Sequence, residues 1–285
     1  MPALQRPAVG GALLALAMAA FALSDALAKQ LAAAFPPFAL GWFRYFGLLL
    51  IVLPLALRRP ALVRTAHPWL QLLRAAALVG SAVFFLYALR SIPQAEATAM
   101  VFASPLCVLL LARLLLHERI GARRLAPVLA GFVGVLVVVR PGSFNFGGAE
   151  VFPLLSSLSW ATAVVLTRKL SASDDSRTTM LYSAGFGVLG LSLLMPAVDW
   201  TPARTTWPLI VAMALCWCAA QWGVVAAYRM AAPSVIAPFS YSQLLWAALL
   251  GLGMTGHWPD AFSLAGIGLI VMSGLYAAWI SRTRG

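Results

Sequence analysis

The chain has 285 residues, of which 62% are hydrophobic and only 10% are charged, and its mean hydropathy is +0.91. Soluble globular domains usually carry about 25% charged residues, so this composition excludes that class. It predicts an all-α polytopic membrane protein. The net charge of +12 lies in short segments between apolar runs, which excludes a nucleic-acid-binding surface.

Ten apolar runs follow one another along the chain, each close to the roughly 17 to 25 residues that cross a bilayer as a helix. They occupy residues 10–33, 37–57, 70–89, 95–116, 125–139, 149–169, 179–197, 207–228, 235–255 and 262–281. If the N-terminus is cytoplasmic, most of the 20 Lys and Arg residues fall in cytoplasmic connections. Because basic loops favour that side, we expect ten transmembrane helices with both termini in the cytoplasm.

The second half of the chain repeats the first at a constant offset of 139 positions. This offset places residues 95–142 on residues 234–281 without a gap, and it places Phe21 on Trp160 near the other end of each half. One offset that serves the first and last helices of both halves indicates a duplication.

The predicted repeats are residues 8–146 and residues 147–285, with five helices in each. Because five is an odd number, the second repeat enters the membrane from the opposite side. We therefore expect two inverted repeats, an arrangement that many transporters share.

Four charged residues within or beside the spans are candidate coupling or structural charges. Asp25 and Lys29 are four positions apart and share a face of the first predicted helix. They form either a neutralising pair or a substrate or proton site facing water, since ionisable groups inside a membrane are costly. Arg44, in the second predicted helix, either pairs with Asp25 or binds a substrate carboxylate. Glu96 lies near the outer end of the fourth predicted helix.

The candidate substrate-binding residues are polar and aromatic side chains at predicted mid-membrane positions. Pro105 breaks the fourth helix beside Ser104 and frees a backbone carbonyl, which either lines a site or only accompanies a kink. Aromatic rings can stack on a substrate, although packing against neighbouring helices is their commoner role. The full set is Tyr87, Ser104, Ser156, Trp160, Trp217, Gln221, Trp222, Ser240, Tyr241 and Gln243.

The His and Cys residues give no sign of an enzyme or a metal site. His117 lacks the second His of a zinc motif four residues on. Cys107, Cys216 and Cys218 all lie in apolar runs, where they are interpreted as small apolar fillers. We therefore expect no catalytic activity, no metal and no cofactor.

The order of these motifs, together with the duplication, resembles the drug/metabolite transporter superfamily in its EamA-type ten-helix form. The motifs are Asp25-Ala-x-x-Lys29, Arg44-Tyr45, a Pro105-containing fourth span that ends before Glu118-Arg119, and Gly266-x-x-x-Ile270-Val271-x-x-Gly274. The resemblance covers nearly the whole chain. It implies two inverted five-helix repeats around a central cavity through which small metabolites move, often outward.

Within that superfamily the chain is most similar to bacterial exporters of aromatic and neutral amino acids of the YddG type. Two residues depart from the pattern of relatives. His257 stands where many carry a Glu, and the first helix lacks the Glu on which small multidrug exporters rely. The second departure argues against proton-driven export of cationic drugs.

These observations predict an inner-membrane exporter of aromatic or neutral amino acids in bacteria, working by alternating access. The alternatives are an importer of another metabolite, of the S-adenosylmethionine, sugar or nucleotide type, and a channel-like pore. The expected partners are a small-molecule substrate and the lipid bilayer, with no nucleic acid. We expect a monomer or a weak homodimer.

Overall fold

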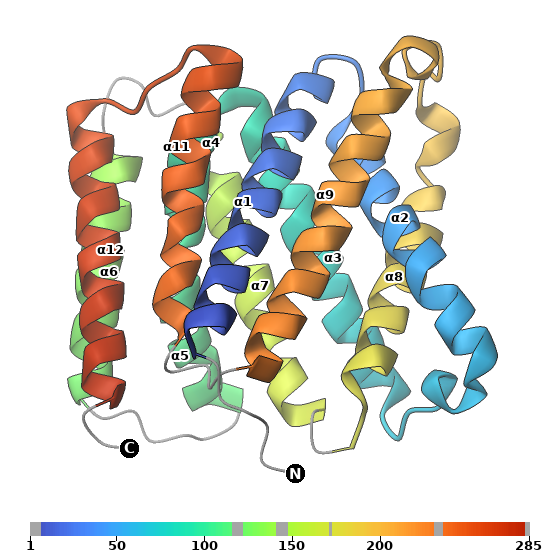
Figure 1. Cartoon of the computed structure of the whole chain (residues 1–285), viewed down its shortest axis with the longest axis horizontal. Coiled ribbons are helices and arrows are strands. Elements are labelled where there is room, and N and C mark those ends of the chain that lie inside the picture. The colour runs from blue at the N-terminus through green and yellow to red at the C-terminus, as the bar shows by residue number, and fades with distance from the viewer. Residues whose placement is uncertain (1–6, 116–121, 141–147, 171–172, 231–235, 283–285) are drawn as a thin grey trace.

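The computed structural model describes residues 7–115, 122–140, 148–170, 173–230 and 236–282. Within these ranges the chain is helical and contains no strand (Figure 1). Six helical segments of the described residues are long and apolar enough to cross a membrane, one of them Gln94–Leu115 with a short interruption inside it, and shorter apolar helices accompany them. The prediction of an all-α polytopic membrane protein is confirmed. Glu118 and Arg119, which contributed to the family resemblance, lie outside the described residues.

The α-helices follow the predicted apolar runs. Their bounds are α1 Pro7–Leu31, α2 Pro37–Arg58, α3 Pro68–Ser91, α4 Gln94–Val101, α5 Ser104–Leu115, α6 Ala122–Val139, α7 Val151–Leu170, α8 Ser176–Ser192, α9 Ala203–Met230, α11 Ser242–Thr255 and α12 Ala261–Arg282. Short 3-10 helices lie between them at η1 Pro60–Val63, η2 Met195–Ala197 and η3 Ala237–Tyr241. The fourth predicted run is thus divided into α4 and α5, and in the ninth run η3 leads into α11.

Local chemistry sets several helix ends. Pro37 and Pro68 occupy the first turns of α2 and α3, where the missing backbone N–H has no partner in the helix anyway. Asp175 caps α8, because its carboxylate accepts a hydrogen bond from the backbone N–H of Arg177 at 2.8 Å. After α11 the chain turns at Gly256, whose φ of 67° is a left-handed conformation that favours glycine.

The helices pack in pairs that join distant parts of the chain. α1 packs against α9, and α7 packs against α3, while α6 pairs with α12, α2 with α8 and α4 with α11. Figure 1 shows α1 rising from the edge of the molecule at which α12 ends, and α7 descending toward the same edge. The offset of 139 positions places α1 on α7 and α3 on α9, so the α1–α9 pair corresponds to the α7–α3 pair, as expected for two repeats of one structure. The boundary between residues 146 and 147 and the inverted topology stay predictions.

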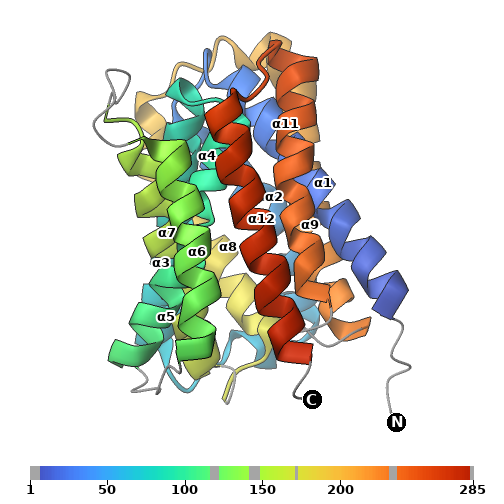
Figure 2. The ribbon, with the colours of Figure 1, turned by 90° about the vertical axis from the view of Figure 1, so that its left-hand side faces the viewer.

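Glycines allow the close approach of α6 and α12, which lie side by side in Figure 2. A Cβ atom added to Gly266 would lie 2.6 Å from Cγ2 of Val138 and 2.7 Å from the carbonyl oxygen of Gly134. Lipid tails are as apolar as leucine, so helices in a membrane associate through close van der Waals packing. The absence of side chains at Gly134 and Gly266 is therefore what lets this pair form.

Replacing Gly266 with Ala is expected to lower the stability of the folded protein by about 1–3 kcal/mol, because the new methyl group overlaps α6. The matched control is Gly268→Ala on the same helix, where an added Cβ atom meets nothing within 4 Å. That variant should match or slightly exceed the wild type. Thermal unfolding in detergent measures both, and equal losses would contradict the proposed packing.

Candidate functional site

A buried ion pair joins α1 to α2. Nη2 of Arg44 donates a hydrogen bond to Oδ1 of Asp25 at 3.0 Å, and the two residues are 2% and 4% exposed. Asp25 lies six residues before the end of α1, which at about 1.5 Å per residue places it roughly 9 Å below that end. The pair therefore lies within the apolar part of the bundle rather than at its surface.

Lys29, one turn further along α1, does not neutralise Asp25. Its ammonium group donates to the backbone carbonyl oxygens of Leu89 at 2.9 Å and Ile92 at 2.6 Å. These carbonyls lie at the end of α3, where helix carbonyls lack partners and carry partial negative charge. Lys29 thus caps α3, and Asp25 is left to Arg44.

One donor of this pair has no partner. Nε of Arg44 is buried and makes no hydrogen bond, although the other side of the guanidinium holds Asp25. A buried donor without an acceptor costs about 1–3 kcal/mol. Since the pair as a whole is neutral, a neutral group that offers an acceptor to Arg44 and a donor to Asp25 would satisfy it without adding a buried charge.

Hydrogen bonds between α1 and its neighbouring helices fix α1 around Asp25. The hydroxyl of Ser24 donates to the backbone carbonyl of Met213 on α9 at 2.9 Å. The side-chain amide of Gln94, at the start of α4, donates to the carbonyl of Ala22 at 2.7 Å. Both donors are buried, so α1 is held in register with α4 and α9 at the depth of the ion pair.

Two helices are interrupted within the bundle, at matching positions of the duplicated sequence. α4 ends at Val101, and the backbone N–H groups of Phe102 and Ala103 bond three residues back before α5 starts at Ser104. In the other half η3 ends at Tyr241, and α11 starts at the next residue. Interrupted helices at membrane depth occur where protein buries the backbone or where a cavity is lined.

The rings at these two interruptions meet. Phe102 and Tyr241 stack with their centroids 5.1 Å apart and an interplanar angle of 24°. α4 and α11 are therefore joined by an aromatic contact at the point where each helix loses its regular hydrogen bonding.

Other predicted site residues take part in contacts between helices. Ser156 of α7 donates to the carbonyl oxygen of Ser81 on α3 at 2.9 Å. Tyr87 stacks on Phe152 across the same pair of helices, with ring centroids 5.3 Å apart. These contacts bind α3 to α7.

The remaining predicted site residues lie on α5, η3, α7, α9 and α11. Trp217 packs edge-on against Tyr45, with centroids 5.2 Å apart, in a cluster between α2, α8 and α9. Trp160 and Trp222 are 43% and 41% exposed. The half-buried residues are Ser104, Gln221, Ser240, Tyr241 and Gln243. A common site for all ten stays a prediction.

A polar network joins both halves at the end of the molecule opposite the α1 start. Ser263 donates to Oε1 of Glu96 at 3.2 Å, and Nε2 of His257 lies 3.8 Å from the same oxygen. Arg140 pairs with Asp260 and donates to Ser263 at 3.3 Å. The hydrogen bond from Arg140, together with the N–H of Ser263, holds the pKa of Asp260 well below its usual range.

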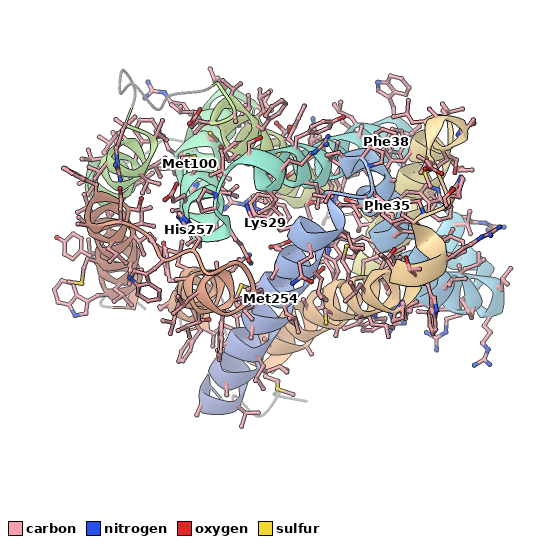
Figure 3. The ribbon with its side chains drawn as sticks, turned by 90° about the horizontal axis from the view of Figure 1, so that it is seen from above. Lys29, Phe35, Phe38, Met100, Met254 and His257 are labelled. Carbon is pink, nitrogen blue, oxygen red and sulfur yellow. The ribbon has the colours of Figure 1, made fainter. Side chains whose placement is uncertain are left out.

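His257, a member of this network, is labelled in the view from above, where Lys29 and Met100 are drawn near it (Figure 3). Sequence reasoning selected Glu96 but missed Ser263, Asp260 and Arg140. Their contacts join segments more than 100 positions apart, and no local spacing indicates them.

The fold and the buried charges define a polytopic membrane protein that holds polar chemistry inside an apolar bundle. The model of the EamA-like transporter family matches residues 9–140 and again residues 148–278. The chain belongs to the EamA-like transporter family, as the resemblance to the drug/metabolite transporter superfamily predicted. The two matches begin 139 positions apart, the offset at which the sequence repeats.

Similar proteins include a riboflavin transporter of Rhizobium johnstonii, 29% identical over 95% of this chain and 91% of that protein. A riboflavin transporter of Vibrio cholerae is 28% identical over 89% and 87%. An S-adenosylmethionine uptake transporter of Rickettsia prowazekii is 24% identical over 94% and 91%. A crystal structure 22% identical in sequence covers 97% of this chain and 98% of its own, with a TM-score of 0.66, and it shares the fold.

Removing Arg44 alone, as in Arg44→Gln, is expected to lower stability by about 3–5 kcal/mol, because Asp25 is left as a buried unpaired charge. The double variant Asp25→Asn/Arg44→Gln removes both charges and should recover most of that loss. Thermal unfolding in detergent measures the three proteins. Recovery in the double variant is the decisive comparison, and a double variant no more stable than Arg44→Gln would contradict the pairing.

Proposed function

We propose that this transporter takes up a neutral, ring-bearing metabolite of the riboflavin type. This replaces the expected export of amino acids with the importer alternative, because the relatives described above are named for riboflavin and for S-adenosylmethionine uptake. Both of those compounds contain a planar heteroaromatic ring. The narrower similarity to amino-acid exporters of the YddG type finds no support among these relatives.

The observation that carries the proposal is the unpartnered Nε of Arg44 beside Asp25. The flavin ring ends in an imide edge that offers carbonyl acceptors on either side of one N–H donor. In the proposal, Arg44 donates to a carbonyl of this edge and Asp25 accepts from its N–H, so each hydrogen bond orients the ring. An amino acid also carries a donor and an acceptor, and the relatives favour the ring.

Transport is proposed to occur by alternating access between residues 8–146 and residues 147–285 as inverted halves. Both termini are placed in the cytoplasm and the protein in the bacterial inner membrane, on the basis of its basic connections. One half then rocks against the other and exposes the bound ring to each side in turn.

The test is uptake of labelled substrates into proteoliposomes containing the purified protein. Saturable riboflavin uptake is expected, with little uptake of tryptophan, phenylalanine or threonine. N3-methylriboflavin, which lacks the imide N–H, should compete about tenfold less well, because Asp25 then faces a methyl group. Uptake of amino acids without riboflavin would overturn the proposed substrate class. Uptake of S-adenosylmethionine alone would mean that the ion pair binds the aminopyrimidine edge of an adenine ring instead of the flavin imide.

The role of the ion pair is tested separately, in Asp25→Asn/Arg44→Gln. Riboflavin uptake by this folded double variant is expected to fall about tenfold or more, since neither charge remains to hold the imide. The matched control is Arg140→Gln/Asp260→Asn, which removes the partly exposed ion pair of the polar network that contains Glu96. The control variant should take up riboflavin at about the wild-type rate. An equal loss of uptake in both variants would argue against a specific role for the buried pair.

A further inference from the structure

The two rings that stack at the helix interruptions are the same position of the duplicated sequence. The offset of 139 positions places Phe102 on Tyr241, and these two rings are in contact. In a molecule with two-fold related halves, a residue can touch its own counterpart only near the two-fold axis. The stack therefore marks that axis at the level of the interrupted helices.

Contacts between α6 and α12 lie about the same axis. A Cβ atom added to Gly131 would meet Ser273, and one added to Gly134 would meet Ile270. The offset converts the first of these contacts into the second, because it places Gly131 on Ile270 and Gly134 on Ser273. The packing of α6 on α12 is thus unchanged when the halves are exchanged.

Contacts away from the axis behave differently. Ser81 of α3 is hydrogen-bonded to Ser156 of α7. The counterparts of these residues are Ala220 of α9 and Ala17 of α1, whose side chains cannot form a hydrogen bond. When the halves are exchanged, this hydrogen-bonded Ser–Ser contact therefore corresponds to an Ala–Ala contact without a hydrogen bond.

We propose that Phe102 and Tyr241 form the pivot about which the two halves move during transport. The proposal rests on the duplication and on the alternating access proposed above. If the opposite-facing state arises when the halves exchange conformations, the Phe102–Tyr241 contact maps onto itself and persists in both states. Contacts off the axis map onto different residue pairs and have to change.

The surroundings of the stack suit a pivot. A Cβ atom added to Gly274 of α12 would overlap the ring of Tyr241, so the tip of this ring lies directly on the α12 backbone. Tyr241 therefore contacts both the ring of Phe102 and the backbone of α12. The backbone around Phe102 already lacks regular helical bonding, and Pro105 cannot donate to Val101, so bending there breaks few hydrogen bonds.

The test fixes the two positions together. In a chain whose Cys107, Cys216 and Cys218 are replaced by Ala, Phe102→Cys/Tyr241→Cys is joined with a short bis-methanethiosulfonate reagent. Mass spectrometry measures the cross-link whether or not riboflavin is the substrate. Uptake is compared with that of the same Cys/Cys variant before cross-linking, because loss of the two rings lowers the rate by itself. A pivot keeps about half or more of this unlinked rate after cross-linking, because the two positions never part. Loss of about tenfold or more would overturn the pivot and indicate rings that separate.

Two comparisons complete this experiment. The same reagent applied to Glu96→Cys/Ser263→Cys, which joins α4 to α12 at one end of the molecule, shows how far an off-axis link slows uptake. If the unlinked proteins and the wild type transport none of the substrates, the proposed function fails. Efficient cross-linking of positions 102 and 241 would still support their contact, and absence of any cross-link would overturn it.

Ring substitutions give a second measurement that does not need cross-linking. Phe102→Leu/Tyr241→Leu should lower the maximal uptake rate about tenfold with little change in the KM for riboflavin, because the rings position the helices and do not bind substrate. The matched control is the single variant Tyr241→Phe, which keeps both rings and should transport riboflavin at about the wild-type maximal rate. A raised KM at an unchanged maximal rate would instead make the rings part of the binding site, and the pivot would be wrong.

Discussion

The rest of the structure depends on one constraint: a backbone N–H or C=O group buried in a bilayer has to find its partner within the protein. The described residues meet this constraint with helices, and where α4 and η3 depart from the regular pattern, tight turns supply the hydrogen bonds. The same constraint limits the places where the chain can bend. Bending is confined to segments such as Phe102–Ala103, which other protein segments cover.

Buried charge obeys the same rule at a higher energy. Asp25 is tolerable inside the bundle because Arg44 neutralises it, and Lys29 is tolerable because it reaches the carbonyls at the end of α3. The Nε of Arg44 departs from this rule, because it is buried without an acceptor. A buried donor without an acceptor is destabilising in a protein that only has to fold, but it suits a protein that has to receive a ligand at that depth.

The sequence predicted what depends on composition and local spacing, and it missed what depends on contacts between distant helices. The apolar runs indicated the helices, and the constant offset indicated which positions correspond. The break in the fourth helix was expected at Ser104-Pro105 but lies at Phe102–Ala103, since the bond that Pro105 cannot make would have ended one turn earlier, at Val101. The sequence left both Lys29 and Arg44 open as partners of Asp25, and the structure shows the pair with Arg44, whereas Lys29 binds the end of α3.

The duplication gives a symmetric frame, but the chemistry within it is asymmetric. The counterparts of Asp25 and Arg44 in the second half are Val164 and Ser183, which cannot form an ion pair. If the buried pair holds the substrate, only the first half can hold it in both states of the cycle. The ring would then travel with the first half while the second half moves past it, and the axis at Phe102 and Tyr241 would be the region that both halves share throughout. In the proposed mechanism, symmetric packing about the axis would let the halves rock, and the diverged residues of the first repeat would decide what is carried.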